Sequence, residues 1–219
     1  LKVQYPGVAK AVDTDLDAVA QLLKIARVVT FGPAFDDWLE EVRDMMHREV
    51  DYRLEAETTA HFSELLKLDA RFVVPKVYFD FSTDQVLATR FELGENVSSS
   101  LVSQLSQARR NALAKASLEL FLQELFVWHE IQTDPNFGNY RIRIGGEDEA
   151  DQIVLLDFGA VQKYPSSFID PVCKMISSAY SSDVIGVIKG GVALNFMNES
   201  WPDTVLTEFA KVCIAVLEP

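Results

Sequence analysis

The chain has 219 residues, of which 48% are hydrophobic, so it can bury a substantial core. Its formal net charge is −13 and its isoelectric point is near 4.6. This charge excludes the basic face that nucleic-acid binding needs and disfavours anionic membrane surfaces. Cys173 and Cys213 have neither metal-ligand spacing nor a disulfide framework, and we expect both to be buried and reduced. No apolar run reaches the roughly 18 residues of a membrane span, so we predict no transmembrane segment in this chain.

The amino-terminal segment reads as the end of a strand, a turn and then a helix. Leu1–Tyr5 has strand-like residues and is followed by a Pro-Gly turn. A sheet should not begin with so short an amino-terminal strand, so we expect the chain to be a piece of a longer domain. Asp13 or Thr14 can cap a helix whose apolar residues repeat at helical spacing up to Ala26.

A long helix is predicted from about Phe35 to Leu66, after a break at Phe31–Pro33. Its apolar side chains fall at alternating steps of four and three and therefore share one face. Glu49 lies in the middle of this apolar stripe. Because a carboxylate that faces a core is costly unless it is paired, Glu49 predicts a cationic partner. The alternative is that the helix is rotated and Glu49 is a charge at the rim.

The middle of the chain predicts a hairpin followed by a helical stretch. Val73–Phe79 and Gln85–Phe91 read as strands, and Ser82–Asp84 between them is a turn sequence. Ser98–Ser100 can cap a helical stretch over Leu101–His129 that contains a break. The connector before these serines is the natural boundary between a small part and a helical part.

A second hairpin is predicted downstream. Tyr140–Ile144 alternates like a strand, Gly145–Asp151 reads as a solvated acidic loop, and Ile153–Leu156 is the returning strand. The rest of the chain reads as helical, with a break near Asn198–Pro202.

Two motifs flank this second hairpin. The range Asp134–Asn139 reads Asp-Pro-Asn-Phe-Gly-Asn, and Asp157–Gly159 reads Asp-Phe-Gly after an apolar strand. Each motif alone is an ordinary turn, but their order and spacing are typical of the phosphoryl-transfer half of a protein-kinase-like site. A carboxylate at Asp157 and an amide oxygen at Asn139 are ligands that suit Mg²⁺, and Asp134 can orient an attacking hydroxyl.

These residues resemble the UbiB/AarF (ADCK-type) atypical kinase family. The likeness runs from Lys2 to about Val161 and is carried by four segments, Lys2–Val8, Glu49–Ala56, Asp134–Asn139 and Leu156–Gly159. The family's upstream Lys-x-Gly-Gln segment, Ala-rich nucleotide loop and first two strands do not occur in this chain. We therefore expect activity and tight nucleotide binding in the intact protein.

The resemblance implies a role for each matching residue. Lys2 would contact the α- and β-phosphates of ATP and pair with Glu49, while Glu55 would answer the upstream lysine. The catalytic aspartate would be Asp134. Asn139 and Asp157 would be the Mg²⁺ ligands. Phe91, Glu92 and Leu93 would form the hinge that reads the adenine.

The resemblance implies an α+β, protein-kinase-like fold with two lobes. Residues 1–97 would form a partial small lobe, and residues 98–219 would form a helical large lobe with the catalytic loop and the Asp-Phe-Gly turn. We expect a cytoplasmic protein, or one that is peripheral at a membrane in its full-length form.

The implied function is that of an ATP- and Mg²⁺-dependent phosphotransferase or ATPase that supports ubiquinone or other prenyl-lipid metabolism. Its partners would be the nucleotide and prenyl-lipid biosynthesis enzymes or lipid, with no nucleic acid. Two alternatives stay open: a nucleotide-responsive scaffold or pseudokinase without useful turnover, and a small-molecule kinase of the aminoglycoside or choline type.

Overall fold

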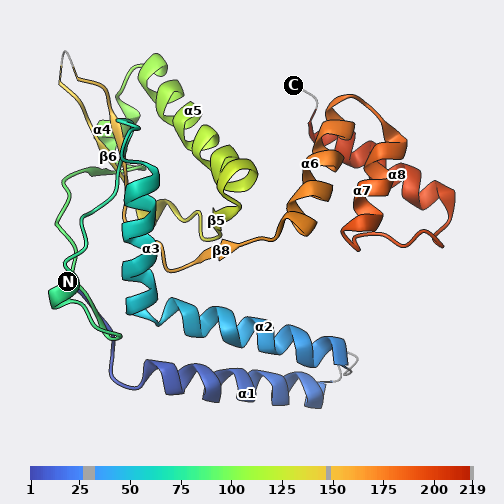
Figure 1. Cartoon of the computed structure of the whole chain (residues 1–219), viewed down its shortest axis with the longest axis horizontal. Helices are drawn as coiled ribbons and strands as arrows, with labels where there is room; N and C mark the ends of the chain where they lie inside the picture. The colour runs from blue at the N-terminus through green and yellow to red at the C-terminus, as the bar shows by residue number, and fades with distance from the viewer. Residues whose placement is uncertain (27–32, 147–148, 218–219) are drawn as a thin grey trace. The chain divides into compact units, whose positions relative to one another are not determined.

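The computed structural model describes residues 1–26, 33–146 and 149–217 (Figure 1). These residues form two compact units. The first comprises Leu1–Ser117 and Gln132–Val161, and the second comprises Leu118–Ile131 and the chain from Gln162 onward. The predicted hairpin of Tyr140–Ile144 and Ile153–Leu156 thus belongs to the same unit as the amino-terminal strand. These units are groups of residues in mutual contact, whereas the predicted lobes, residues 1–97 and 98–219, divide the chain at one point in the sequence. The boundary between the lobes stays a prediction.

Short strands organise the first unit. Strand β1 (Lys2–Val3) pairs antiparallel with β3 (Val86–Leu87). A four-stranded sheet has the order β2 (Phe72–Val73), β7 (Gln152–Leu155), β6 (Tyr140–Arg143) and β4 (Glu95–Asn96), in which β2 is parallel to β7 and the other neighbours are antiparallel. The predicted hairpin of Tyr140–Ile144 and Ile153–Leu156 is confirmed. Its central residues, Ile153, Val154 and Leu155, are buried, which explains their unbroken apolar run.

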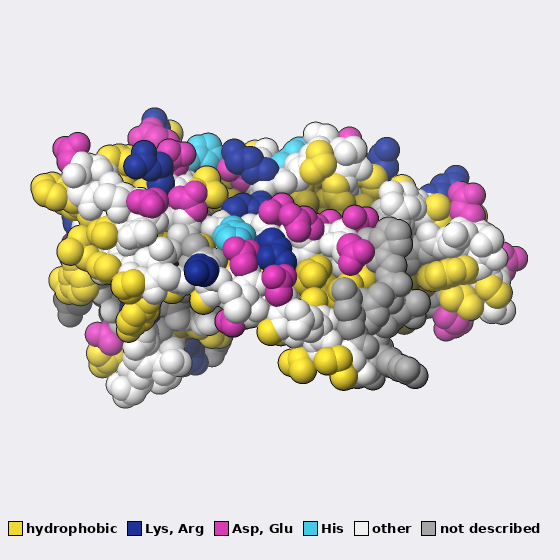
Figure 2. Space-filling model, turned by 90° about the horizontal axis from the view of Figure 1, so that it is seen from below, with side chains coloured by type: hydrophobic (Ala, Val, Ile, Leu, Met, Phe, Trp, Pro, Cys, Tyr) yellow, Lys and Arg dark blue, Asp and Glu magenta, His cyan; other side chains and the backbone are white. Residues whose placement is uncertain are grey.

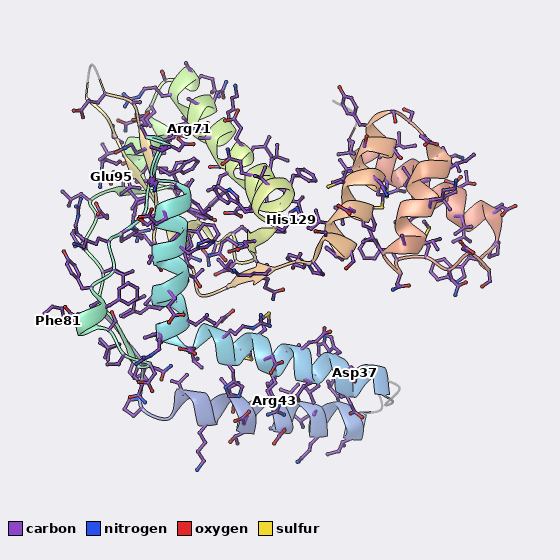
Figure 3. The ribbon with its side chains drawn as sticks, viewed as in Figure 1. Asp37, Arg43, Arg71, Phe81, Glu95 and His129 are labelled. Carbon is purple, nitrogen blue, oxygen red and sulfur yellow. The ribbon has the colours of Figure 1, made fainter. Side chains whose placement is uncertain are left out.

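Helices α1 (Val8–Ala26) and α2 (Pro33–Glu49) lie side by side (Figure 1). The predicted cap at Asp13 or Thr14 is wrong, because α1 already begins at Val8 after Gly7, whose φ of 83° favours glycine. Arg43 of α2, labelled in Figure 3, donates to Asp13 and Asp17 of α1 at 2.7 and 2.8 Å. Of the predicted break at Phe31–Pro33, Phe31 and Gly32 lie outside the described residues.

The predicted long helix over Phe35–Leu66 is in fact two helices, α2 and α3 (Tyr52–Leu65). The break occurs at Asp51, whose backbone is extended (φ −95°, ψ 91°) and whose carboxylate accepts hydrogen bonds from the amides of Arg53 and Leu54. An aspartate in this position is a favourable N-cap, so it ends one apolar register and starts another.

The hairpin predicted from Val73–Phe79 and Gln85–Phe91 forms only around its middle. The Tyr78 amide donates to Ala88 at 2.8 Å, and a short 3₁₀ helix, η1 (Phe79–Phe81), makes the turn. Phe81 projects from this turn and is exposed (Figure 3). Each end of the predicted hairpin pairs with a distant strand instead, β2 with β7 and β3 with β1. These partners are remote in sequence, so local alternation could not indicate them.

The predicted helical stretch after Ser98–Ser100 has the expected break. Ser99 caps α4 (Ser100–Ser103), and α5 (Gln107–Gln123) continues into a π-helix, η2 (Glu124–Trp128). The chain then leaves the helix at His129, whose φ is 57°. Strand β5 (Glu130–Gln132) follows and pairs with β8 (Val161–Lys163).

The second unit is built mainly from three helices that pack together (Figure 1), α6 (Ser166–Tyr180), α7 (Val184–Ala193) and α8 (Asp203–Val216). Ala179, Val187 and Ala210 form its buried core. The predicted break at Asn198–Pro202 lies between α7 and α8 as expected. Cys173 and Cys213 are free but half-buried rather than buried, and burial raises the pKa of the Cys213 thiol.

Candidate active site

An ion pair joins the amino-terminal strand to helix α3. The Lys2 ammonium lies 2.9 and 2.8 Å from the two carboxylate oxygens of Glu55, and it also donates to Asp157 Oδ2 at 3.1 Å. It lies 5.0 Å from the centre of the Tyr52 ring. The Glu55 side chain is only 1% exposed, whereas that of Lys2 is 41% exposed. The lysine is therefore held from below by a buried anion and remains open to a ligand from outside.

The lysine's partner is Glu55, so the predicted pairing of Lys2 with Glu49 is wrong. Glu49 is the exposed last residue of α2, and the N-cap at Asp51 starts a new helix after it. In α3, the buried face consists of Glu55, Ala56, Thr59 and Phe62. A core-facing glutamate does pair with a cation in this protein, but that glutamate is Glu55 and not Glu49. The sequence signal that distinguishes the two is the N-cap at Asp51, which starts a new helix between them.

The catalytic-loop motif forms a compact turn before β6. Asn136 accepts a hydrogen bond from the Gly138 amide at 2.8 Å, and a 3₁₀ turn, η3 (Phe137–Asn139), leads into the strand. The Asn139 side-chain amide donates to Asp134 Oδ2 at 2.9 Å. Asp134 is exposed, so one carboxylate oxygen is fixed by Asn139 while the group stays accessible.

The Asp-Phe-Gly turn follows β7 directly. Phe158 is 3% exposed and its ring centre lies 4.9 Å from that of Phe62 on α3. The Gly159 amide donates to Asp157 Oδ1 at 2.9 Å. A Cβ atom on Gly159 would lie 3.3 Å from Asp157 Oδ1 and 3.6 Å from Glu55 Oε2, so the chain passes close to both carboxylates. The buried phenylalanine thus fixes the turn beneath the ion pair.

Strand pairing brings the two motifs together. Tyr140 is opposite Leu155 in the β6–β7 hairpin, and the Leu156 amide donates to the Asn139 carbonyl at 2.9 Å. Asn139 directly precedes β6 and Asp157 follows the end of the antiparallel strand β7, so both residues lie at the same end of this hairpin. The structure links Lys2 to Asp157 and Asp134 to Asn139, and the lysine's buried partner is Glu55 rather than Glu49. The roles of these residues stay predictions.

The predicted hinge residues alternate between exposed and buried. Phe91 and Leu93 are 84% and 72% exposed, and the Glu92 carboxylate between them is buried. Arg90 and Arg143 donate to its two oxygens at 2.8 and 2.6 Å. The Glu92 side chain is thus part of an internal ion-pair cluster, and any contact with a base would use the backbone of this segment. Its role as a nucleotide hinge stays a prediction.

A sequence profile of the ABC1 atypical kinase-like domain matches residues 1–190. The chain belongs to this family. This membership confirms the resemblance to UbiB/AarF kinases and agrees with the kinase-like order of the motifs.

Curated relatives agree with the ABC1 assignment. The chain is 32% identical to the mitochondrial atypical kinase coq-8 of Caenorhabditis elegans over 90% of this chain and 26% of the relative. It is 35% identical to COQ8B of Danio rerio, over 90% and 31%, and 31% identical to COQ8 of Saccharomyces cerevisiae, over 94% and 42%. All three are named mitochondrial atypical kinases. The chain thus spans less than half the length of each of these three relatives.

A solved structure agrees with the fold. The complex of Rv3197 with erythromycin from Mycobacterium tuberculosis has a TM-score of 0.72 to this chain, at 20% identity, and covers 97% of this chain and 53% of that one. With the ABC1 assignment, this likeness confirms the predicted α+β, protein-kinase-like fold.

The donor set of this ABC1 domain fits Mg²⁺. No group of three or more His, Cys, Asp or Glu side chains arranged to hold a metal occurs among the described residues. At the predicted metal site, Asp157 offers a carboxylate and Asn139 offers its Oδ1 atom, since its Nδ2 donates to Asp134. Mg²⁺ binds through one or two carboxylates, keeps several waters and takes further oxygens from phosphates, so a sparse, all-oxygen site suits it.

Charge in the site favours a bound cation. Burial alone lowers the pKa of Lys2, but hydrogen bonds and charges from Glu55 and Asp157 outweigh it and raise that pKa, so Lys2 is a fixed cation. Burial raises the pKa of Glu55, and the nearby charge of Asp157 adds to this, while Lys2 opposes both. One ammonium thus faces two carboxylates, and the excess negative charge is what a metal ion would neutralise.

The surface of the ABC1 domain is mixed in charge where Figure 2 shows it. Acidic and basic side chains are interspersed over that face. None of the described helices is both long enough and apolar enough to cross a membrane.

Proposed function

We propose that this ABC1 domain is the catalytic part of an ATP- and Mg²⁺-dependent phosphotransferase or ATPase of the UbiB type. The observation that carries the proposal is the Lys2–Glu55 ion pair, with Asp157 at 3.1 Å from the same ammonium and Asp134 fixed by Asn139 on the adjacent strand. These are the parts that positioning and charge neutralisation of a transferring phosphoryl group require.

In this proposal Lys2 binds the α- and β-phosphates. Its ammonium has three donors, and Glu55 occupies a fixed direction below it. Because the Glu55 carboxylate is buried, it binds the ammonium from the protein side and does not occupy the solvent-exposed side where a ligand would bind. Two donors bind the oxygens of Glu55, and the donor now directed at Asp157 Oδ2 would turn to the phosphates when Asp157 serves as a metal ligand. A lysine acts on phosphates as a point charge.

Asp134 orients the nucleophile. Its carboxylate is exposed and one of its oxygens is held by Asn139, so the other can accept a hydrogen bond from the hydroxyl of an acceptor or from water. The proton of that hydroxyl would pass to Asp134 as the phosphoryl group is transferred. Asn139 and Asp157 would hold Mg²⁺, and the chemistry that this ion would supply is neutralisation of the charge on the phosphates.

The test is ATP turnover by the full-length protein with Asp157→Asn. We expect ADP release to fall at least a hundredfold, because the substitution removes a charged metal ligand. Asp80→Asn is the matched control, since Asp80 is exposed on the turn η1. ADP release that is equal in wild type, Asp157→Asn and Asp80→Asn would contradict the proposal.

The same experiment separates the main alternative. A nucleotide-responsive scaffold would bind ATP in a Mg²⁺-dependent way, lose this binding in Asp157→Asn, and release no ADP above background. The ABC1 assignment favours both of these readings over a small-molecule kinase of the aminoglycoside or choline type.

The cellular role that we propose is support of ubiquinone or other prenyl-lipid metabolism, at the surface of a membrane, with enzymes of that pathway or lipid as partners. Its support is the likeness to UbiB-type motifs. Prenyl-quinone content in cells that carry only the Asp157→Asn protein tests it, with the expectation that the content falls as it does when the protein is absent.

A further inference from the structure

Gln132 contacts both halves of the proposed site with one side chain. It is the last residue of β5 and is half-buried. Its Oε1 atom accepts a hydrogen bond from the Asp134 amide at 3.2 Å, and its Nε2 atom donates to the Asp157 carbonyl at 2.7 Å. A single planar amide therefore joins the residue that carries the catalytic carboxylate to the residue that carries the metal-binding carboxylate.

The orientation of this amide follows from its partners. An amide oxygen can only accept and an amide nitrogen can only donate. If the group were turned by 180°, its NH₂ would face the Asp134 N–H and its oxygen would face the Asp157 carbonyl, which gives two repulsive contacts. The observed orientation is therefore the one in which both hydrogen bonds can form.

The next residue reinforces the same link. The Thr133 amide and hydroxyl both donate to the Ala160 carbonyl, at 3.1 and 2.6 Å. The carbonyls of Asp157 and Ala160, at the two ends of the Asp-Phe-Gly turn, are thus both bound by the two residues that precede Asp134. The turn is held to the catalytic loop at two points.

We propose that Gln132 is a positioning residue that sets the distance between the Asp134 and Asp157 carboxylates. The inference rests on the proposed function. Its two hydrogen bonds described above run to backbone atoms of Asp134 and Asp157, so its effect would pass through the backbone of both residues. A chain of contacts then runs from Asn139 through Asp134, Gln132 and Asp157 to Lys2 and Glu55.

Gln132→Glu is the sharpest variant. It keeps the shape and the acceptor for the Asp134 amide, but it places a carboxylate oxygen against the Asp157 carbonyl where the Nε2 donor was. Gln132→Ala removes both bonds without adding charge. Because small displacements of reacting groups cost up to about a hundredfold, we expect kcat for ADP release to fall roughly 10- to 100-fold in both variants. The Mg²⁺ concentration for half-maximal rate should rise severalfold, and KM for ATP should change little.

Gln152 provides a matched control. It is also half-buried, it donates from Nε2 to the Ala70 carbonyl at 2.7 Å, and it accepts at Oε1 from Arg143 at 3.2 Å. It is the first residue of β7, whereas Asp157 follows the other end of that strand. Gln152→Glu and Gln152→Ala remove equivalent bonds outside the site and should leave kcat and the Mg²⁺ dependence unchanged.

The experiment measures kcat, KM for ATP, Mg²⁺ dependence and melting temperature for the full-length protein, its four glutamine variants and Asp157→Asn. A fall in kcat with raised Mg²⁺ demand in the Gln132 variants, at melting temperatures equal to those of the Gln152 variants, supports the inference. If Asp157→Asn abolishes turnover but the Gln132 and Gln152 variants behave alike, the inference is overturned and the proposed function stands. If Asp157→Asn leaves turnover unchanged, the proposed function fails and the inference fails with it.

Discussion

Each of the two units is stabilised internally by a different kind of contact. In the first, short strands and loops are joined by polar contacts between residues far apart in sequence, such as Lys2 with Glu55 and Asp157. In the second, three helices pack through small and apolar side chains around Ala179, Val187 and Ala210. The comparison teaches that the stability of the first unit, here called the polar unit, depends on individual hydrogen-bonding atoms. The stability of the second, the apolar unit, depends on how well the volumes of its side chains fit together.

The largest expected effect comes from removing the cation of the polar unit. Lys2→Met should lower ATP turnover by a factor on the order of 10² or more, because the phosphates lose a positioned charge. It should also destabilise the first unit by about 1–3 kcal/mol, because the buried Glu55 carboxylate loses its main partner. Chemical denaturation and ADP release measure the two effects, and Lys10→Met, at an exposed position on α1, is the control.

A second substitution sharpens this result. Adding Glu55→Gln to Lys2→Met removes the unpaired charge, so part of the lost stability should return while turnover stays low. A double variant less stable than Lys2→Met would show that the cost does not come from the buried charge.

A change of volume should damage the apolar unit instead. A Cβ atom on Gly190 would lie 2.7 Å from Met175 Cβ and 3.1 Å from Met175 Cα, so Gly190→Ala forces α6 and α7 apart. We expect a loss of about 1–3 kcal/mol, as for overpacked cores. Lys189→Ala, at an exposed position in the same helix, should be close to neutral. Equal denaturation midpoints for the two variants would argue against close packing at this glycine.

Two helix caps allow a matched comparison of the units. Asp51 caps α3 and Asp183 caps α7, where it accepts a hydrogen bond from the Gly186 amide at 3.0 Å. Each change to alanine should cost about 1 kcal/mol of stability. Only Asp51→Ala should also reduce turnover, because α3 carries Glu55. Loss of turnover in both variants would show that the activity tracks stability alone.

The smallest expected effect is a dependence of stability on acid. Arg109 donates to Asp151 and, against the opposing effect of burial, holds the pKa of that carboxyl below its usual value of 3.8. A lowered folded pKa gives stability that is present above 3.8 and is lost as the pH falls through the folded value. Thermal melts from pH 5 to about pH 2 should show a shallower acid slope for Asp151→Asn than for wild type. An unchanged slope would mean that this pair does not contribute.

The parts of the fold that sequence could indicate were those with local causes. The β6–β7 hairpin and the helices after Pro165 follow from alternation, periodicity and turn residues, and the structure has them. The break between α2 and α3 was missed because apolar spacing continues across it, and only the Asp51 cap interrupts the backbone. The pairing of β2 with β7 was missed because its two strands are distant in sequence.

The residues of the candidate site could be selected from the sequence, but their geometry could be predicted only in part. Asp134, Asn139 and Asp157 follow from their order along the chain, and Lys2 from its likeness to a lysine strand. The choice between Glu49 and Glu55 depended on the helical register, which changes at Asp51. The link through Gln132 had no sequence signal, because any residue before the loop could have pointed outward.

The bond between the Gln4 side chain and the Val50 carbonyl, at 2.6 Å, has a consequence for how such domains can vary. It joins the chain just after Lys2 to the chain just before α3, so helices α1 and α2 form a loop that leaves and returns at one closed base. The cost of closing a loop grows only slowly with its length. Evolution or an engineer could therefore lengthen, shorten or replace this pair of helices while the lysine and its glutamate stay in place.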